Sequence, residues 1–318
     1  MSKLIVVGNA CVEVHVPPHE PPPPGGSAEV ESIAFRVGGK AVNTAITAAR
    51  LGATTAYAGV LGGDLAGEFI RDTLRGEGVD VSRLRLLPGR TSPTQVVQMN
   101  SRREASIVRA AGTNDDFELE SVVLRAPCSL FHISAPELLG GIWPRKAIDL
   151  VRQLKVEGRR VSVDVFAEGS GGPRAMERNV REHRHLMELI EMVFVSEEEA
   201  ALISGRKEKD SAMRYFHERG IGTVVIKCGA KGAIVSVNGW TEEIPAAKSR
   251  VVDPAGAGDN FVGGFLAGHV RGLDPVQCGR LGCTLGALCV RHVGPLAGTS
   301  DPQRLEKILN NLEVALSR

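Results

Sequence analysis

The sequence predicts an α/β fold in which a mainly parallel central sheet is flanked by helices and accompanied by a small second β-sheet. Short runs rich in Val and Ile recur along the chain, and segments with the helical spacing of apolar residues lie between most of them. Such alternation is typical of a parallel sheet covered on both faces. Two stretches interrupt the alternation, and we expect them to form the small sheet.

The elements of the central sheet follow from these apolar runs. Helical segments between them, such as 68–78 and 213–220, close with Gly, which is a common helix stop. The last third changes character, because residues 256–290 have a helical pattern and a final helix is expected near 301–317. The expected central strands are residues 4–8, 55–60, 129–134, 160–165, 192–195, 223–227 and 233–237.

The two interruptions lie within residues 12–36 and 91–110. In the first, a proline-rich segment precedes the alternating run VESIAFRV, which suits a half-buried strand. The second is typical of two strands around a polar turn at 100–103. Pro21–Pro24 alone indicate no more than a surface loop. Because the chain has no linker composition and no internal repeat, we expect residues 1–318 to form a single domain with a β appendage.

The charge balance excludes several classes of partner. Lys and Arg number 38 against 37 Asp and Glu, a formal net charge of +1. This balance gives no electrostatic case for binding nucleic acid or a membrane. The chain has no apolar run of eighteen residues, and its start leads directly into a strand pattern without a signal peptide. We therefore expect a cytoplasmic protein.

The six cysteines do not form a metal-binding pattern. No Cys-x-x-Cys pair occurs, and the closest spacings, among Cys278, Cys283 and Cys289, do not match a zinc module. Five of the six lie in apolar stretches, where Cys behaves as a small hydrophobe. We expect buried free thiols and no transition-metal site.

The strongest chemical signal is VVDPAGAGDNFVGGFLAG, residues 251–268. A short strand is expected to lead into the small residues 255–258 and then a helix. Small residues let the unpaired N–H groups of a helix N-terminus approach an anion, and the helix dipole favours a phosphate there. Asp259 beside such an anion hole suits a base that accepts a proton from an attacking hydroxyl. A Gly-rich turn with Asp259 as a helix cap explains the same residues equally well.

A second segment, residues 35–53, carries a weaker signal. Gly38 and Gly39 permit a tight turn or close backbone contact with a ligand. Asn43, in the first turns of the following helix, offers both a donor and an acceptor to a polyol hydroxyl. A plain Gly-Gly turn with a local Asn cap is the simpler interpretation.

A third segment places Lys227, Gly229 and Gly232 in a turn between two strands. Such a turn suits nucleotide phosphates, although a plain hairpin is the commoner explanation. The sequence has neither the G-x-x-x-x-G-K-[ST] motif nor the protein-kinase motifs, so those two kinds of ATP site are excluded.

Taken in this order, the segments resemble the ribokinase (PfkB-type) family of carbohydrate kinases over nearly the whole chain. GGKAVNTAITAARLG is similar to the family's first signature, and DPAGAGDNFVGGF is similar to its second, D-T-x-G-A-G-D. LGGDLAGEFIRDTLRGEGVD, AGTND, VSEEEA and KCGAKGA lie between them in the matching order. The resemblance implies a ribokinase-like fold whose two β interruptions form a lid that closes over the sugar and often pairs two subunits.

The resemblance also implies a role for individual residues. Asp259 would be the general base on the acceptor hydroxyl, and Gly256, Ala257 and Gly258 would form the anion hole for the transferring phosphoryl group. This short set suits phosphoryl transfer, which depends mainly on positioning and charge neutralisation. The other implied contacts are to the sugar (Glu13, Gly38, Gly39, Lys40, Asn43), ATP (Ser196, Lys227, Gly229, Gly232), Mg²⁺ through water (Glu199) and an optional monovalent cation such as K⁺ (Asp253).

Several positions depart from the family pattern. Cys11 and Glu13 stand where an Asn-x-Asp motif usually binds sugar hydroxyls, and Glu is one methylene longer than Asp. Ser196 replaces the Asn of an N-x-x-E motif, and Pro254 replaces a Thr, which removes one N–H donor. The base, the anion hole and the magnesium-linked Glu199 are retained.

We therefore expect an ATP- and Mg²⁺-dependent kinase that phosphorylates a primary hydroxyl of a small sugar. A nucleoside kinase of the same fold would add apolar groups around a base, for which Phe35, Trp143 and Phe166 are candidates. A non-catalytic sugar- or nucleotide-binding member is the alternative outside enzymes, and retention of Asp259 and Glu199 argues against it.

A phosphosugar kinase is a third enzyme alternative. It would need basic residues on the substrate side, for which Arg102, Arg103 and Arg109 are candidates.

Two further expectations concern a cation and a partner chain. In relatives a monovalent cation lies near carbonyls that correspond to residues 253–255 and to the loop 291–300. A small projecting sheet has open edges and an apolar face to cover, which favours a homodimer through the lid.

Overall fold

The computed structural model describes residues 4–17, 19–20, 22–99, 105–116, 128–140, 143–166 and 172–314. Its main feature is a nine-stranded sheet in the order β13-β12-β11-β10-β9-β8-β1-β4-β5. All neighbours pair in parallel except β11–β12 and β12–β13, which are antiparallel. The strands are β1 (Leu4–Gly8), β4 (Thr55–Gly62), β5 (Asp80–Leu87), β8 (Leu130–Ser134), β9 (Val161–Asp164), β10 (Met192–Ser196), β11 (Thr223–Lys227), β12 (Ala233–Val237) and β13 (Trp240–Ile244).

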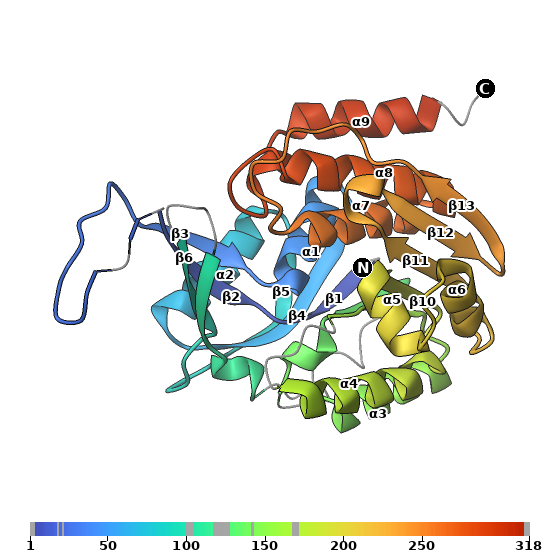
Figure 1. Cartoon of the computed structure of the whole chain (residues 1–318), viewed down its shortest axis with the longest axis horizontal. Helices are drawn as coiled ribbons and strands as arrows, with labels where there is room; N and C mark the ends of the chain where they lie inside the picture. The colour runs from blue at the N-terminus through green and yellow to red at the C-terminus, as the bar shows by residue number, and fades with distance from the viewer. Residues whose placement is uncertain are drawn as a thin grey trace.

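Helices cover both faces of this sheet (Figure 1). Each face has its own apolar core, because the central strands bury side chains on both sides. The α/β class with a mainly parallel sheet is therefore confirmed. One layer contains α1 (Lys40–Arg50), α2 (Leu65–Gly76), α7 (Ala257–Arg271), α8 (Pro275–Cys289) and α9 (Pro302–Val314), and the other contains α3 (Arg145–Val156), α4 (Gly172–Met187), α5 (Glu197–Ser204) and α6 (Lys209–His217).

A separate four-stranded sheet has the order β3-β2-β6-β7 and lies to one side of the main sheet (Figure 1). It combines the two interruptions of the sequence pattern, as expected, although the turn at 100–103 lies outside the described residues. Residues 22–33 extend away from it and contain no helix or strand. Its strands are β2 (Cys11–Val16), β3 (Ala34–Gly38), β6 (Thr94–Met99) and β7 (Ala105–Ala110).

Strand register gives this small sheet one polar and one apolar row. Because paired residues share a face, one row across all four strands is Arg36–Glu13–Gln95–Arg109. The next row lies on the opposite face and reads Phe35–Val14–Val96–Val108. Phe35 is 65% exposed and Val108 is 73% exposed, so no other part of the described chain covers these two side chains of the apolar row.

The structure differs from the sequence-based expectations at one strand and adds two others. The strand expected at Val251 and Val252 does not form, because these side chains are 61% and 40% exposed and the Val252 N–H donates to the Val290 carbonyl after α8. The edge strands β5 and β13 were not anticipated, whereas the helices of the last third are confirmed.

All six cysteines are free and five are buried, in agreement with the sequence. Among the described helices, none has the length and apolar character needed to cross a membrane.

Candidate active site

Asp259 lies in the first turn of α7, close to where that helix begins. The N-cap of α7 is Gly256, whose φ of 78° lies in the left-handed region. A Cβ at this position would lie 2.3 Å from the Pro295 Cβ, so only Gly fits here. Within this turn the Ala257 N–H donates to the Pro254 carbonyl at 3.3 Å, and Asp259 is only 6% exposed.

The Asp259 carboxylate faces the N-terminal half of α1. The Asn43 Nδ2 donates to Asp259 Oδ2 at 2.9 Å, and the Lys40 Nζ lies 3.2 Å from Asp259 Oδ1. The Thr44 hydroxyl donates to the Asp259 carbonyl at 3.4 Å. Two segments that are 216 residues apart in the sequence, from Asn43 to Asp259, thus meet at one carboxylate. The helix-cap interpretation of Asp259 is wrong, because Gly256 is the N-cap and both carboxylate oxygens contact α1.

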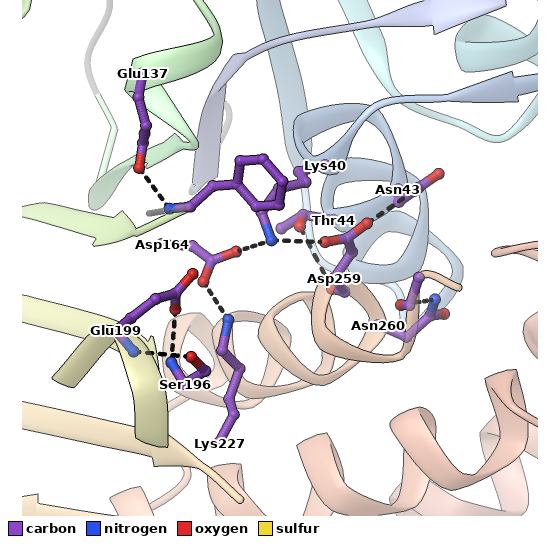
Figure 2. Close-up of polar contacts among 12 residues, drawn as sticks. Lys40, Asn43, Thr44, Glu137, Asp164, Ser196, Glu199, Lys227, Asp259 and Asn260 are labelled. Carbon is purple, nitrogen blue, oxygen red and sulfur yellow. Dashed lines mark hydrogen bonds and ion pairs between the residues drawn. The ribbon is translucent and has the colours of Figure 1, made fainter. Parts of the chain in front are cut away.

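A line of alternating charges continues from Asp259 across the carboxyl ends of the strands (Figure 2). The Lys40 Nζ lies 3.0 Å from Asp164 Oδ2, and the Lys227 Nζ donates to Asp164 Oδ1 at 2.5 Å. Asp164 ends β9 and is fully buried. Burial alone would raise the pKa of the Asp164 carboxyl, but the ammonium groups of Lys227 and Lys40 hold it below its ordinary value.

The neighbouring charges shift the pKa of Lys40 upward, opposite to the shift of Asp164. Burial of its ammonium alone would lower the pKa of Lys40, but Asp164 and Asp259 raise it above its ordinary value. The amine therefore stays charged and lies between two carboxylates. Its Nζ also lies 5.6 Å from the centre of the Phe166 ring, which is within cation–π range.

Glu199 and Ser196 lie together at the start of α5. The Ser196 N–H donates to Glu199 Oε2 at 2.6 Å, and the Glu199 N–H donates to the Ser196 hydroxyl at 3.1 Å, which is a capping box. Burial raises the pKa of Glu199 above its ordinary value, although the Lys227 ammonium opposes this. The Lys227 Nζ also lies beside Gly258, 3.8 Å from where a Cβ would stand. Residues expected at the nucleotide and at the anion hole are therefore neighbours.

The turn between β11 and β12 holds Gly229 and Gly232, as the sequence indicated. It follows directly after Lys227, so this turn borders the same edge of the main sheet.

Glu13 lies on the polar row of the small sheet and faces Gly38. A Cβ on Gly38 would meet the Glu13 Oε1 at 2.3 Å, so Gly38 makes room for this side chain. Glu13 accepts a hydrogen bond from Gln95 Nε2 at 2.6 Å, and its other oxygen lies 2.8 Å from His15 Nε2. Gln95 Oε1 in turn accepts from Arg109 Nε at 3.2 Å.

Arg36, at the other end of the row, extends to Gly294. Its Nη1 is buried and has no hydrogen-bond partner within the described part of the chain.

Asp253 joins two loops beside the N-terminus of α7. Its Oδ1 accepts from the Ala255 N–H at 2.9 Å and its Oδ2 accepts from the Gly294 N–H at 2.8 Å. The Cys289 thiol donates to the carbonyls of Ala255 and Pro295, both at 3.3 Å. The Ala255 and Pro295 carbonyls therefore lie together on the Cys289 thiol, in the region where the family resemblance implied an optional monovalent cation.

The aromatic candidates for binding a nucleobase are not gathered in one place. Phe35 lies on the outward apolar row, opposite the face that carries Glu13, so its assignment to a base pocket is wrong. Trp143 packs on the His183 ring at 4.7 Å, away from the Asp259 carboxylate contacts. Phe166 alone borders the charged centre, through Lys40. Arg102 and Arg103 lie outside the described residues.

The sequence interpretation missed Asp164 and a buried pair behind it. Glu137 Oε1 accepts from the Phe166 N–H at 2.5 Å and lies 3.0 Å from His183 Nε2, and both side chains are almost fully buried. The signal that was available for Asp164 is its position, because an acidic residue at the carboxyl end of a parallel strand borders the ligand edge of such sheets.

The donor set fits Mg²⁺ bound together with nucleotide phosphates. No group of three or more His, Cys, Asp or Glu side chains suited to a metal occurs among the described residues. Mg²⁺ usually keeps several waters and uses one or two carboxylates plus substrate phosphates, so such a group is not required. Glu199, which is buried and lies within electrostatic range of Lys227, is a carboxylate that would hold such an ion through its waters.

Comparison with known proteins places this geometry in context. The model of the "pfkB family carbohydrate kinase" matches residues 1–302. Ribokinase of Haemophilus influenzae is 27% identical over 296 residues, which cover 90% of each chain. Cytidine kinase of Thermococcus kodakarensis is 29% identical over 289 residues, covering 89% of this chain and 94% of the relative. The structure of Arabidopsis thaliana ribokinase complexed with ribose and ATP has a TM-score of 0.82 and 24% identity, covering 97% of this chain and 99% of that one.

Proposed function

The chain belongs to the pfkB family of carbohydrate kinases, phosphotransferases that act on an alcohol group, and we propose that it transfers the γ-phosphoryl group of ATP to a primary hydroxyl of a small carbohydrate. The observation that carries this proposal is the convergence of Asn43, Lys40 and Asp259 beside the N-terminus of α7. We also propose that residues 1–318 act as one kinase domain, with the four-stranded sheet as its lid, in the cytoplasm.

The chain's own residues supply each part of this reaction. Asp259 accepts the proton of the acceptor hydroxyl as oxygen attacks phosphorus. The N–H groups of residues 256–258, at the positive end of the α7 dipole, hold the charge that builds up on the transferring phosphoryl oxygens. Asn43 fixes the orientation of the Asp259 carboxylate with one amide hydrogen, while its Oδ1 has no partner within the described residues and is available for an acceptor hydroxyl.

The nucleotide is proposed to bind along the carboxyl ends of β10 and β11. Lys227, Gly229 and Gly232 would contact the phosphates and the nucleoside part of ATP. Ser196, at the start of α5, would also border the nucleotide. When bound, Mg²⁺ neutralises phosphate charge, and Glu199 would hold its water ligands. We further propose K⁺ at the carbonyls around Asp253, because the loops joined by that side chain bring those carbonyls together.

The polar row of the small sheet is proposed to contact the acceptor, together with Gly38 and Gly39. It lies on the face that leads through Gly38 to Lys40 and Asp259, and it offers both hydrogen-bond acceptors and donors. Glu13 is already bonded to Gln95 and His15, so it is held in one orientation. A neutral polyol is the first candidate for the substrate.

A phosphosugar is the second candidate, and Arg109 is the observation that favours it. Its Nε donates to Gln95 Oε1 and the side chain is exposed, which leaves the edge formed by its two terminal guanidinium nitrogens for a ligand. This edge of a guanidinium suits a bidentate contact with an anion.

We also propose a homodimer in which the apolar row of one small sheet packs on that of a second copy. The row is continuous across all four strands, and Phe35 and Val108 are mostly exposed. A second copy covers this face and the open edges together. Sedimentation velocity at micromolar concentration should give twice the chain mass, and a 33.8 kDa species would contradict the dimer. Val108→Lys should shift the protein towards that monomer.

The proposed function is tested by measuring ADP release from ATP over a panel of acceptors, with and without K⁺. The panel contains pentoses, hexoses, keto-acids, nucleosides and sugar phosphates. We expect a free sugar to give the highest kcat/KM and K⁺ to raise the rate. If only nucleosides cause ADP release, the substrate is a nucleoside rather than a sugar. If no acceptor causes ADP release, the kinase assignment for this chain is contradicted.

A further inference from the structure

Asp164 is a buried carboxylate that has no role in the reaction proposed above. Its side chain is fully buried, and each of its oxygens contacts one ammonium group, Oδ2 that of Lys40 and Oδ1 that of Lys227 (Figure 2). A buried carboxylate is costly unless it is paired, so these two contacts keep it ionised. Four side chains therefore form an unbroken sequence of charges, Lys227–Asp164–Lys40–Asp259.

The place of Lys40 in this sequence bears directly on the base. Its Nζ is nearly midway between two carboxylates, 3.0 Å from Asp164 and 3.2 Å from Asp259. A lysine paired with Asp259 alone would shield that carboxylate and make it a weaker base, because a close cation stabilises the ionised form. A second carboxylate on the other side of Lys40 attracts the same ammonium group, so Lys40 stabilises the ionised form of Asp259 less strongly.

We infer that Asp164 is a positioning residue that holds the Lys40 ammonium between two acids, so that the Asp259 carboxylate remains available to the proton of the acceptor. The inference rests on the proposed function, because it takes Asp259 as the base. It also gives Lys40 a different task from the sugar contact implied by the family resemblance. Lys40 tunes the base, and Asp164 determines how strongly it does so.

Other titratable groups around Asp259 do not disturb this relation. Cys11 from β2 and Cys289 from α8 both lie within electrostatic range of the carboxylate. Burial raises the pKa of Cys289 to about 12 and raises that of Cys11 as well, so both thiols stay neutral in the working pH range. Glu199 acts on this centre through Lys40, whose charge it helps to maintain.

The test is the pH dependence of kcat/KM for the acceptor, whose acid limb reports the pKa of the base in the free enzyme. In Asp164→Asn, Lys40 pairs with Asp259 alone, so the acid limb should move down by about 1 pH unit and kcat should fall about tenfold. In Lys40→Met the cation is lost, so the limb should move up by about 1 pH unit. A role in folding alone would not move the limb in opposite directions in the two variants.

The double variant shows whether Asp164 acts through Lys40. In the Lys40→Met background, Asp164→Asn should move the limb by much less than it does in the wild type. Asp149→Asn is the matched control, because Asp149 is an exposed carboxylate on α3 that pairs with Arg152. This variant should leave the pH dependence of kcat/KM unchanged. Asp164→Ser is the second variant if Asp164→Asn does not fold, with the same expected direction.

The outcomes separate this inference from the proposed function. If the wild type is an active kinase that needs Asp259 but Asp164 variants lose activity without any shift of the limb, the inference is wrong and the function stands. An equal shift with and without Lys40 also overturns it. If the wild type releases no ADP with any acceptor, the proposed function itself fails.

Discussion

Replacing Asp259 by Asn tests the proposed base with the smallest change of shape. The amide oxygen of Asn can still accept the hydrogen bond that Asn43 Nδ2 donates at 2.9 Å. The amide cannot accept a proton, however, and it leaves the Lys40 ammonium without one of its two carboxylates. Because Asp164 remains, Lys40 is not left as an unpaired charge, and the melting temperature should fall by only ~5 °C.

The size of the catalytic effect follows from the surroundings of Asp259. General-base catalysis typically contributes about 10²–10⁴-fold, or about 3–5 kcal/mol at 1.36 kcal/mol per tenfold change. Asp259 is only 6% exposed, and the neighbouring carboxylate of Asp164 is held by two ammonium groups. Neither bulk water nor this neighbour can replace the base easily. We therefore expect kcat to fall by about 10³–10⁴-fold.

The assay is the initial rate of ADP release at saturating ATP and acceptor, with affinity for ATP measured by calorimetry. The affinity for ATP should change less than about threefold, because Asp259 interacts with the proton of the acceptor rather than with ATP. Asp274→Asn is the matched control, since Asp274 caps α8 by accepting from the Gln277 N–H and lies outside the site. A variant Asp259→Asn that keeps more than a tenth of the wild-type kcat would refute the reasoning, and so would an equal loss in Asp274→Asn.

Three other predictions concern the turn, the metal and the buried pair. Gly256→Ala should cost ~3 kcal/mol or more of stability and most of kcat, whereas Gly78→Ala, at a similar φ of +77° with open space around it, should cost only ~1 kcal/mol in chemical denaturation. Glu199→Gln should raise the Mg²⁺ concentration for half-maximal rate about tenfold or more in a magnesium titration, and an unchanged titration would exclude a role with the metal. Burial alone would lower the pKa of His183, but the neighbouring Glu137 raises it above its ordinary value. The pair therefore stabilises the fold fully below about pH 6.5 and loses this contribution as the pH rises through the raised pKa. Melting temperatures should therefore fall over that range in the wild type and much less in His183→Gln, and parallel curves would contradict the assignment.

The main sheet was predictable because buried parallel strands leave a strong local signal. β1, β10 and β11 are short runs rich in Val and Ile, β8 is the apolar run LFHIS, and all four are buried almost throughout. The edge strand β5 escaped the same criterion, because its pattern DVSRLRLL places charged residues among the apolar ones. An edge strand needs fewer apolar residues, so its composition resembles that of a loop.

The site was predictable only where chemistry and local structure coincide in one segment. Asp259 follows small residues at a helix start, and Asn43 follows a Gly-Gly turn, so each segment allowed a ligand contact, and only their order along the chain favoured it over a plain turn. The only local signal for Asp164 was its position at the end of a strand, because its partners Lys40 and Lys227 come from distant segments. Their meeting depends on strand order, with β9 beside β10 and β10 beside β11, and no local pattern encodes that order.

In the proposed site, the side chains offered to the acceptor depend on the register of the small sheet, where the sequence is least informative. Arg36 and Phe35 are adjacent in β3, yet one belongs to the polar row and the other to the apolar row. A shift of β3 by a single residue would exchange the two faces, placing Phe35 toward the acceptor and Arg36 outward. The pairing of Gly38 with Cys11 resists this shift, because Glu13 occupies the space that any Cβ on Gly38 would need. The same contact that fixes the register therefore also fixes which side chains would meet a substrate in the proposed site, so the longer Glu13 and the absence of a side chain at Gly38 are best understood as one packing feature.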